Sequence, residues 1–348
     1  MQGDVPLNKI IVKHMFRFCA KKMRELFKDK DHLMRKKDNC MWYYSVEDSL
    51  HTHVLRTNSW EEYNEYCEVT SQKEHSRQVF ETLRDTFDMN KVDPLDVVFD
   101  GKYLIVDNGV HRLSLMYHFG HIKETFPLRL LNIRFNDTVQ KRIANALQST
   151  VGGQALYNGW TNRTLFGYHS FELGNMKLIG QRSPTQRLNQ MRDVYSFKGK
   201  KVLDLGCNTG GMLFHCFEMA EGVGLEYDER CVKAAGEIQE ALSFLPPKRI
   251  IQSDLESERI AGRLAGFKPD CVFLLSMGSW IRNWRSLYQQ VLELEPEAIW
   301  METNNASEGE AQLAFFVKAG MNVEKISGAS EDDSTGNYGR SLYFITKV

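Results

Sequence analysis

The sequence lacks the features of a secreted, membrane-spanning or disulfide-bonded protein. Its seven cysteines are odd in number, scattered and never spaced Cys-x-x-Cys, which argues against a disulfide framework or a zinc knuckle. No apolar run approaches the roughly 20 residues of a membrane helix, and no basic segment followed by an apolar stretch opens the chain as in a secretory signal. We therefore expect a cytoplasmic protein with reduced thiols and no membrane partner.

Metal-ligand spacing and a strong net charge are also missing. The histidines at positions 51, 53, 75, 118 and 121 share no spacing typical of a metal site, so we expect no metal. The net charge is −1, which disfavours a nucleic-acid partner for the whole chain. An excess of Lys and Arg gathers only in residues 1–40, where the apolar spacing over 8–30 predicts an amphipathic basic helix that packs on its own protein.

The length of 348 residues favours two domains, and the composition, 42% hydrophobic and 26% charged, is that of a folded protein. In the first half, strands are predicted at 94–98 and 103–106, with Asp100-Gly101 as a hairpin turn, then a helix from near His111 and a strand at 128–133. We expect a smaller α+β domain over 1–150. A segment rich in Gly, Asn and aromatic residues, 152–181, then leads into a second domain over 151–348.

The second half alternates strand and helix, which predicts an α/β domain with a doubly wound, mostly parallel, Rossmann-like sheet. The predicted strands are 201–206, 222–227, 248–252, 270–276, 297–302 and 341–347.

The first of these strands runs into a glycine turn that opens a helix, the place where an open α/β sheet binds nucleotides. Counted from Gly206, the second glycine of the dinucleotide fingerprint is replaced by Asn208, whose side chain occupies the place of a pyrophosphate. The pattern Asp204-x-Gly206-x-x-x-Gly210 instead resembles motif I of the class I S-adenosylmethionine-dependent methyltransferases. This resemblance implies a seven-stranded sheet and S-adenosylmethionine as the cofactor.

The resemblance extends over the following strands. It implies that Glu226 accepts hydrogen bonds from the ribose hydroxyls, that Asp254 receives the adenine amino group beside Leu255, and that Ser276 and Met277 lie near the transferred methyl group. A carboxylate suits a vicinal diol because it offers two acceptor oxygens. The expected cofactor-binding residues are Arg182, Asp204, Gly206, Cys207, Asn208, Gly210, Glu226, Tyr227, Asp254, Leu255, Ser276 and Met277.

Residues 168–187, here called the lead-in, are unusually polar. They resemble the lead-in of the tRNA wobble-uridine carboxymethyltransferases, which implies that Arg182 reaches the cofactor carboxylate through its guanidinium. His169 is a candidate base for a hydroxyl nucleophile, and Glu302 is a second catalytic candidate at the functional edge of the sheet. The expected acceptor contacts in this half are Tyr168, Trp280 and Asn304.

Residues 92–113 resemble the ParB/sulfiredoxin-like fold, in which a glycine turn and His-Arg at a helix start can bind nucleotide phosphates. The residues that carry this expectation are Asp107, Gly109, His111 and Arg112, with Asn108 as an extra residue in the usual pattern. A substrate-presenting role is favoured because fold alone is poor evidence of chemistry.

Several functions remain open on these grounds. The preferred one is methyl transfer to a small-molecule or sugar-like acceptor, with the first domain assisting. The alternatives are an RNA or DNA methyltransferase that uses the basic N-terminal region, a bifunctional protein with a kinase-like or CTPase-like first domain, and an oxidoreductase. No Asn-Pro-Pro-aromatic run or Pro-Cys pair follows the fourth strand, which disfavours DNA amines, protein glutamine and cytosine C5 as targets. The oligomeric state stays open.

Overall fold

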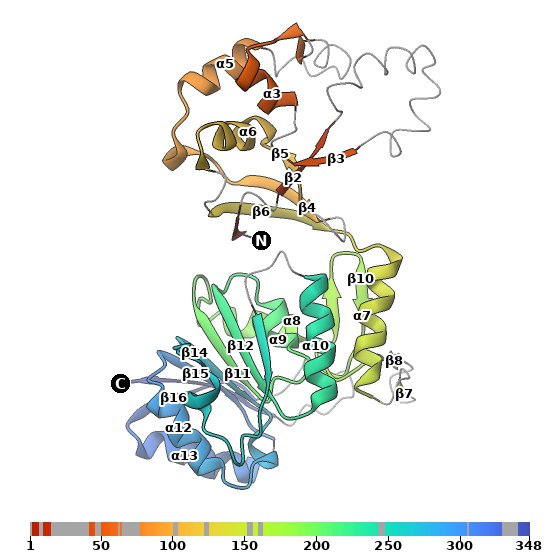
Figure 1. Ribbon diagram of the computed structural model, residues 1–348. Helices are drawn as coiled ribbons and strands as arrows, with labels where there is room; N and C mark the ends of the chain where they lie inside the picture. Colours follow the sequence, from red (N-terminus) through yellow and green to blue (C-terminus); the bar gives the residue numbers. More distant parts are fainter. Residues whose placement is uncertain are drawn as a thin grey trace. The chain divides into compact units, whose positions relative to one another are not determined.

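The computed structural model divides the chain into two units, Met1–Arg134 and Phe135–Val348 (Figure 1). The described residues are 2–6, 10–14, 42–45, 50–61, 63–64, 77–99, 104–121, 125–151, 156–158, 163–242, 248–304, 306–328 and 340–348. The division falls before helix α7 (Asp137–Ser149), whereas the sequence led us to place it after residue 150. The reason is that α7 packs along α10 (Glu229–Ala241) of the second unit, where Arg142 pairs with Glu237 at 2.5 Å.

The second unit contains a seven-stranded, mostly parallel sheet in the order β13-β12-β11-β14-β15-β17-β16. The strands are β11 (Lys201–Leu205), β12 (Glu221–Glu226), β13 (Lys248–Gln252), β14 (Cys271–Leu275), β15 (Ala298–Glu302), β16 (Met321–Ser327) and β17 (Leu342–Lys347). Only β17 runs antiparallel to both of its neighbours. This is the Rossmann-like fold expected from the sequence. Strand β16 was not predicted, because it lies at the edge of the sheet and is mostly polar and solvent-accessible.

Both faces of this sheet are covered, as the continuous apolar strands require. Successive side chains of β11 point to opposite faces, so Leu203 joins a core cluster with α11, α12 and α13, while Val202 joins another with α8 and α9. These helices are α8 (Pro184–Arg192), α9 (Gly211–His215), α11 (Ile260–Arg263), α12 (Trp284–Glu293) and α13 (Ala306–Lys318). The strand that carries the glycine turn is therefore buried on both sides.

The predicted connector 152–181 carries secondary structure of its own. It contains the hairpins β7 (Leu156–Asn158) with β8 (Arg163–Leu165) and β9 (Phe171–Leu173) with β10 (Met176–Leu178). The Asn175 side chain in the second hairpin accepts a hydrogen bond from the Phe135 amide at 2.7 Å. The lead-in is thus an ordered part of the second unit.

The described residues of the first unit form a six-stranded mixed sheet, in the order β1-β6-β4-β5-β2-β3, together with helices. The elements are β1 (Gln2–Pro6), β2 (Ile10–His14), β3 (Trp42–Ser45), α3 (Leu50–Thr57), α5 (Arg77–Asp85), η4 (Met89–Lys91), β4 (Leu95–Phe99), β5 (Leu104–Asn108), α6 (Val110–His118) and β6 (Thr125–Ile133). The antiparallel pairing of β4 with β5 and the helix at His111 match the prediction.

The prediction of a basic helix over 8–30 is wrong for residues 10–14, the part of it that the structure describes. Residues 10–14 form β2, and Ile10, Ile11 and Val12 are β-branched residues that favour a strand. The rest of the predicted helix, residues 8–9 and 15–30, lies outside the described residues. Within the described part of the chain, no helix is long and apolar enough to cross a membrane.

Candidate functional site

The glycine turn after β11 has a backbone that only certain residues adopt. Gly206 and Gly210 have φ angles of +70° and +74°, and Asn208 has +51°. A Cβ on Gly210 would lie 2.9 Å from the ring of Phe214, so a glycine is required there for space as well. The turn therefore brings the chain from β11 into α9 within a few residues.

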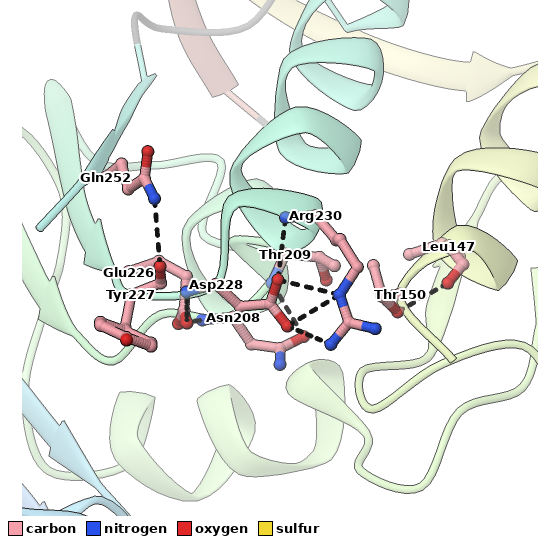
Figure 2. Close-up of polar contacts among 9 residues, drawn as sticks. All are labelled: Leu147, Thr150, Asn208, Thr209, Glu226, Tyr227, Asp228, Arg230 and Gln252. Atoms are coloured by element: carbon pink, nitrogen blue, oxygen red, sulfur yellow. Dashed lines mark hydrogen bonds and ion pairs between the residues drawn. The ribbon is translucent and has the colours of Figure 1, made fainter. Parts of the chain in front are cut away.

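Every backbone amide of this turn has an acceptor within the protein. The amides of Gly206 and Cys207 donate to the Leu225 carbonyl at 2.8 and 3.2 Å, and the Gly210 amide donates to Cys207 at 2.9 Å. The remaining two amides, of Asn208 and Thr209, donate to the Glu226 carboxylate at 2.7 Å and to the Asn208 side chain at 2.9 Å (Figure 2). Within residues 206–210, the backbone is therefore held by hydrogen bonds inside the protein.

Glu226 lies at the end of β12, next to the turn. Its Oε2 accepts from the Asn208 amide, and its Oε1 accepts from the Asp228 amide at 2.9 Å (Figure 2). The two bonds hold the carboxylate in place, while each oxygen has a second lone pair. The side chain can therefore serve as the acceptor for a diol.

Asp204 is buried in β11 and its Oδ2 has no hydrogen-bond partner among the described residues. Burial, with a smaller effect of the nearby Glu226 carboxylate, raises the pKa of Asp204 well above its usual value. A protonated carboxyl group can donate a hydrogen bond. An unsatisfied buried polar atom at this turn fits a polar group of a bound ligand.

The end of β13 joins the same edge of the sheet, because the Ser253 amide donates to the Glu226 carbonyl at 2.9 Å. Asp254 follows, and its carboxylate accepts from the Glu256 amide at 3.0 Å and the Ser257 hydroxyl at 2.8 Å. Leu255 is buried in the core. Tyr227 is 72% exposed, and its carbonyl accepts from the Gln252 side chain (Figure 2).

Ser276 and Met277 follow β14. Ser276 has a φ of +57°, which is uncommon for a residue with a side chain. Met277 is buried, and a Cβ on Gly206 would lie 3.5 Å from its Cβ. The predicted methyl-proximal residue thus packs directly against the first glycine of the turn.

Glu302 at the end of β15 is 3% exposed and is surrounded by arginines. Its carboxylate pairs with Nη2 of Arg182 at 2.8 Å, with Nη2 of Arg187 at 2.5 Å and with Nη1 of Arg340 at 3.8 Å. The Ser276 hydroxyl also donates to it. Arg182 was predicted to bind the cofactor, whereas Arg187 and Arg340 were not predicted, because no local pattern marks an arginine that pairs with a distant strand.

His169 lies against the start of α9, where a Cβ on Gly211 would lie 2.5 Å from its Cγ. Burial, followed by the nearby His215 and Arg182, lowers the pKa of His169 to about 3. The ring is therefore neutral at pH 7, and its Nδ1 has no hydrogen-bond partner among the described residues. Burial also raises the pKa of the adjacent Tyr168.

The predicted acceptor residues Trp280 and Asn304 flank the turn after β14. Trp280 ends the short helix η6 (Gly278–Trp280) and is 79% exposed. The Asn304 side chain donates to the Ser276 carbonyl at 2.9 Å and accepts from the Ser279 amide at 3.4 Å. Both residues lie at the same sheet edge as Met277.

The remaining predicted residues belong to the first unit. Gly109 caps α6 with a φ of +110°, and Asp107 lies exposed at the end of β5. The Arg112 guanidinium donates to the carbonyls of Asp93 and Pro94 at 2.9 and 3.2 Å. His111 lies 2.6 Å from the Tyr63 hydroxyl. These residues thus cluster around the start of α6 within the first unit.

Neither a family model nor a curated protein sequence matches the chain. Similar solved structures include EvdMO1, with 14% identity, a TM-score of 0.44, and coverage of 61% of this chain and 48% of EvdMO1. A SAM dependent methyltransferase from Aquifex aeolicus has 17% identity, a TM-score of 0.37, and coverage of 48% and 90%. Magnesium protoporphyrin IX methyltransferase from Synechocystis PCC 6803, solved with SAM, has 17% identity and a TM-score of 0.36. The match covers 46% of this chain and 76% of that protein. The chain spans about half the length of EvdMO1, and at these identities a likeness concerns the fold alone.

Proposed function

We propose that the second unit binds S-adenosylmethionine and transfers its methyl group to an acceptor. The observation that carries this proposal is the Glu226 carboxylate beside the glycine turn, held by two backbone amides and flanked by Asp204 and Asp254 from the two neighbouring strands. A nucleoside without phosphates needs acceptors for its hydroxyl and amino groups, which Glu226 and Asp254 supply.

We assign the ribose hydroxyls to Glu226, the adenine amino group to Asp254 and the cofactor carboxylate to Arg182. Asp204, with its raised pKa and unsatisfied Oδ2, is a donor or acceptor beneath the turn. When bound, the cofactor supplies an activated methyl group for in-line displacement. The buried Met277 then excludes water from the reacting atoms, and the protein contributes mainly proximity and orientation.

For the acceptor we propose a small molecule or a sugar-like compound that contacts Trp280, Asn304 and Tyr168. An exposed tryptophan offers a flat apolar surface, and the Asn304 side chain lies beside it at the turn. His169 is the candidate base, but a pKa of about 3 makes it a weak one. We therefore expect proximity to contribute more than proton transfer.

We propose that the first unit presents the acceptor, through the ParB-like residues Asp107, Gly109, His111 and Arg112. The Arg112 guanidinium donates to two backbone carbonyls just before β4, which ties the start of α6 to that strand. Titration of the full chain with ATP and CTP tests the alternative of a nucleotide-binding first unit. Millimolar binding that Arg112→Ala abolishes would favour that alternative.

The test of the main proposal is isothermal titration of the full chain with S-adenosylmethionine, S-adenosylhomocysteine and NAD. We expect the first two to bind and NAD not to bind. Transfer of tritiated methyl groups to panels of sugars, carboxylic acids and tRNA then identifies the acceptor class. NAD binding tighter than S-adenosylmethionine binding would refute the proposal in favour of an oxidoreductase.

A further inference from the structure

Ser276 occupies a conformation that the surrounding residues must maintain. A side-chain-bearing residue with a φ of +57° carries backbone strain, and such strain persists only where neighbours hold it. All three of its polar groups are held. Its amide donates to the Glu302 carbonyl at 3.0 Å, its hydroxyl donates to the Glu302 carboxylate, and its carbonyl accepts from Asn304 at 2.9 Å.

The same carboxylate holds the lead-in. Arg182 and Arg187 both reach Oε2 of Glu302, at 2.8 and 2.5 Å, and both are at most 3% exposed. Arg182 also pairs through its backbone with Tyr168, whose carbonyl accepts the Arg182 amide at 2.7 Å. One side chain therefore joins the ends of β14 and β15 to a segment more than a hundred residues earlier in the sequence.

The contacts continue to the glycine turn. Met277 follows Ser276 directly and lies beside Gly206, where a Cβ added to the glycine would lie 3.5 Å from the Met277 Cβ. The path from Arg182 through Glu302 to Ser276 and Met277 consists of an ion pair, a hydrogen bond and a peptide bond, and it ends beside the glycine turn. Such a path can transmit the position of the lead-in to the cofactor site.

We propose that Glu302 is a positioning residue, which sets the Ser276–Met277 turn and the Arg182 guanidinium together, and is not a general base. A carboxylate paired with three guanidiniums and a hydroxyl is a poor acceptor for a substrate proton, because proton uptake would weaken all of these contacts. The expected effect of Glu302 on cofactor affinity rests on the proposed function. The coupling of the lead-in to the Ser276–Met277 turn does not depend on it.

The experiment compares Glu302→Gln with Glu297→Gln by hydrogen exchange and by titration with S-adenosylhomocysteine. Glu297 precedes the same strand at its other end and is also ion-paired, to Lys200 at 2.5 Å, which makes it a matched control. We expect Glu302→Gln to speed exchange in both the lead-in and residues 276–280, and to raise the Kd about tenfold. Glu297→Gln should change neither.

Two Ser276 variants keep the test decisive if Glu302→Gln fails to fold. Ser276→Gly removes the hydroxyl and the strain, whereas Ser276→Ala removes the hydroxyl but keeps the strained backbone. If Glu302 positions this turn through the hydroxyl, both variants weaken binding, and Ala does so more than Gly. Wild-type binding and exchange in both Ser276 variants would overturn the proposal.

The outcomes also separate this inference from the proposed function. If the wild-type chain binds no S-adenosylhomocysteine, the cofactor proposal fails, while exchange in the two segments still decides whether Glu302 couples them. Suppose that the wild type binds S-adenosylhomocysteine, and that Glu302→Gln keeps wild-type hydrogen exchange and affinity but loses turnover. Glu302 is then a catalytic residue, and the positioning role is wrong.

Discussion

Glu226 accepts a hydrogen bond from the backbone amide of Asn208, with 2.7 Å between Oε2 and the nitrogen. The residue predicted to bind the ribose thus also orders the glycine turn of the preceding strand. One carboxylate therefore links the shape of the turn to the recognition of the ligand.

Replacing Glu226 tests whether this residue, and not another acidic residue nearby, binds the ligand. Glu226→Gln presents an amide NH₂ group to a backbone N–H, so one donor loses its acceptor, at a cost of about 1–3 kcal/mol. We expect the Kd for S-adenosylhomocysteine to rise about 10- to 100-fold, measured by titration calorimetry. Glu229→Gln, at the exposed start of α10, is the control, and equal affinities in the two variants would show that the ribose lies elsewhere.

Asn208→Gly tests whether the turn can accept a dinucleotide. The change restores the second glycine of the dinucleotide fingerprint and relieves a positive φ, but the amide at 208 still donates to Glu226. We expect S-adenosylhomocysteine to bind within about tenfold of the wild type and NAD not to bind. Acquired NAD binding would mean that the Asn208 side chain alone excludes the pyrophosphate.

Gly211→Ala should destabilise the fold through overpacking, since its Cβ would lie 2.5 Å from His169 Cγ. The expected loss in free energy of unfolding is about 1–3 kcal/mol, measured by urea denaturation. Gly236→Ala in α10, where a Cβ meets nothing within 4 Å, should stabilise the helix by contrast. His169→Ala combined with Gly211→Ala should recover part of the loss. Additive effects would contradict the contact.

The stability of the fold should fall in acid because two histidines are buried in neutral form. Burial lowers the pKa of His169 to about 3 and that of His215 to about 4, below the value of an unfolded chain. Between about pH 4 and pH 6.5 the unfolded state therefore binds more protons, and stability is present above this window and lost as the pH falls through it.

Burial raises the pKa of Asp204 well above its usual value, so this residue contributes to the pH dependence with the opposite sign. The clean measurement is therefore the difference between the wild type and His215→Gln, by urea denaturation at several pH values. The slope of stability against pH should be lower in the variant by about 1.4 kcal/mol per pH unit. Equal slopes would mean that His215 is charged in the folded protein.

The sequence determined the parts of the fold that local patterns encode. Apolar strands alternating with helices indicated the α/β sheet, and Gly206 and Gly210 marked a turn that needs positive φ angles. The acidic residues Glu226 and Asp254 were predicted from the resemblance to class I methyltransferases, not from a local pattern. The edge strand β16 and the strand β2 were missed, since neither has a periodicity that distinguishes it locally.

Only the tertiary structure decided the partners of the charged residues. Glu302 was predicted as a catalytic candidate at the functional edge of the sheet, and in the structure it is buried against Arg182, Arg187 and Arg340. Likewise, the amides of Gly206 and Cys207 donate to the Leu225 carbonyl, and the Asn208 amide donates to the Glu226 carboxylate, both in the next strand. Side-chain periodicity reports only which face of an element is apolar, whereas an ion pair depends on which distant segments the topology brings within a few ångströms.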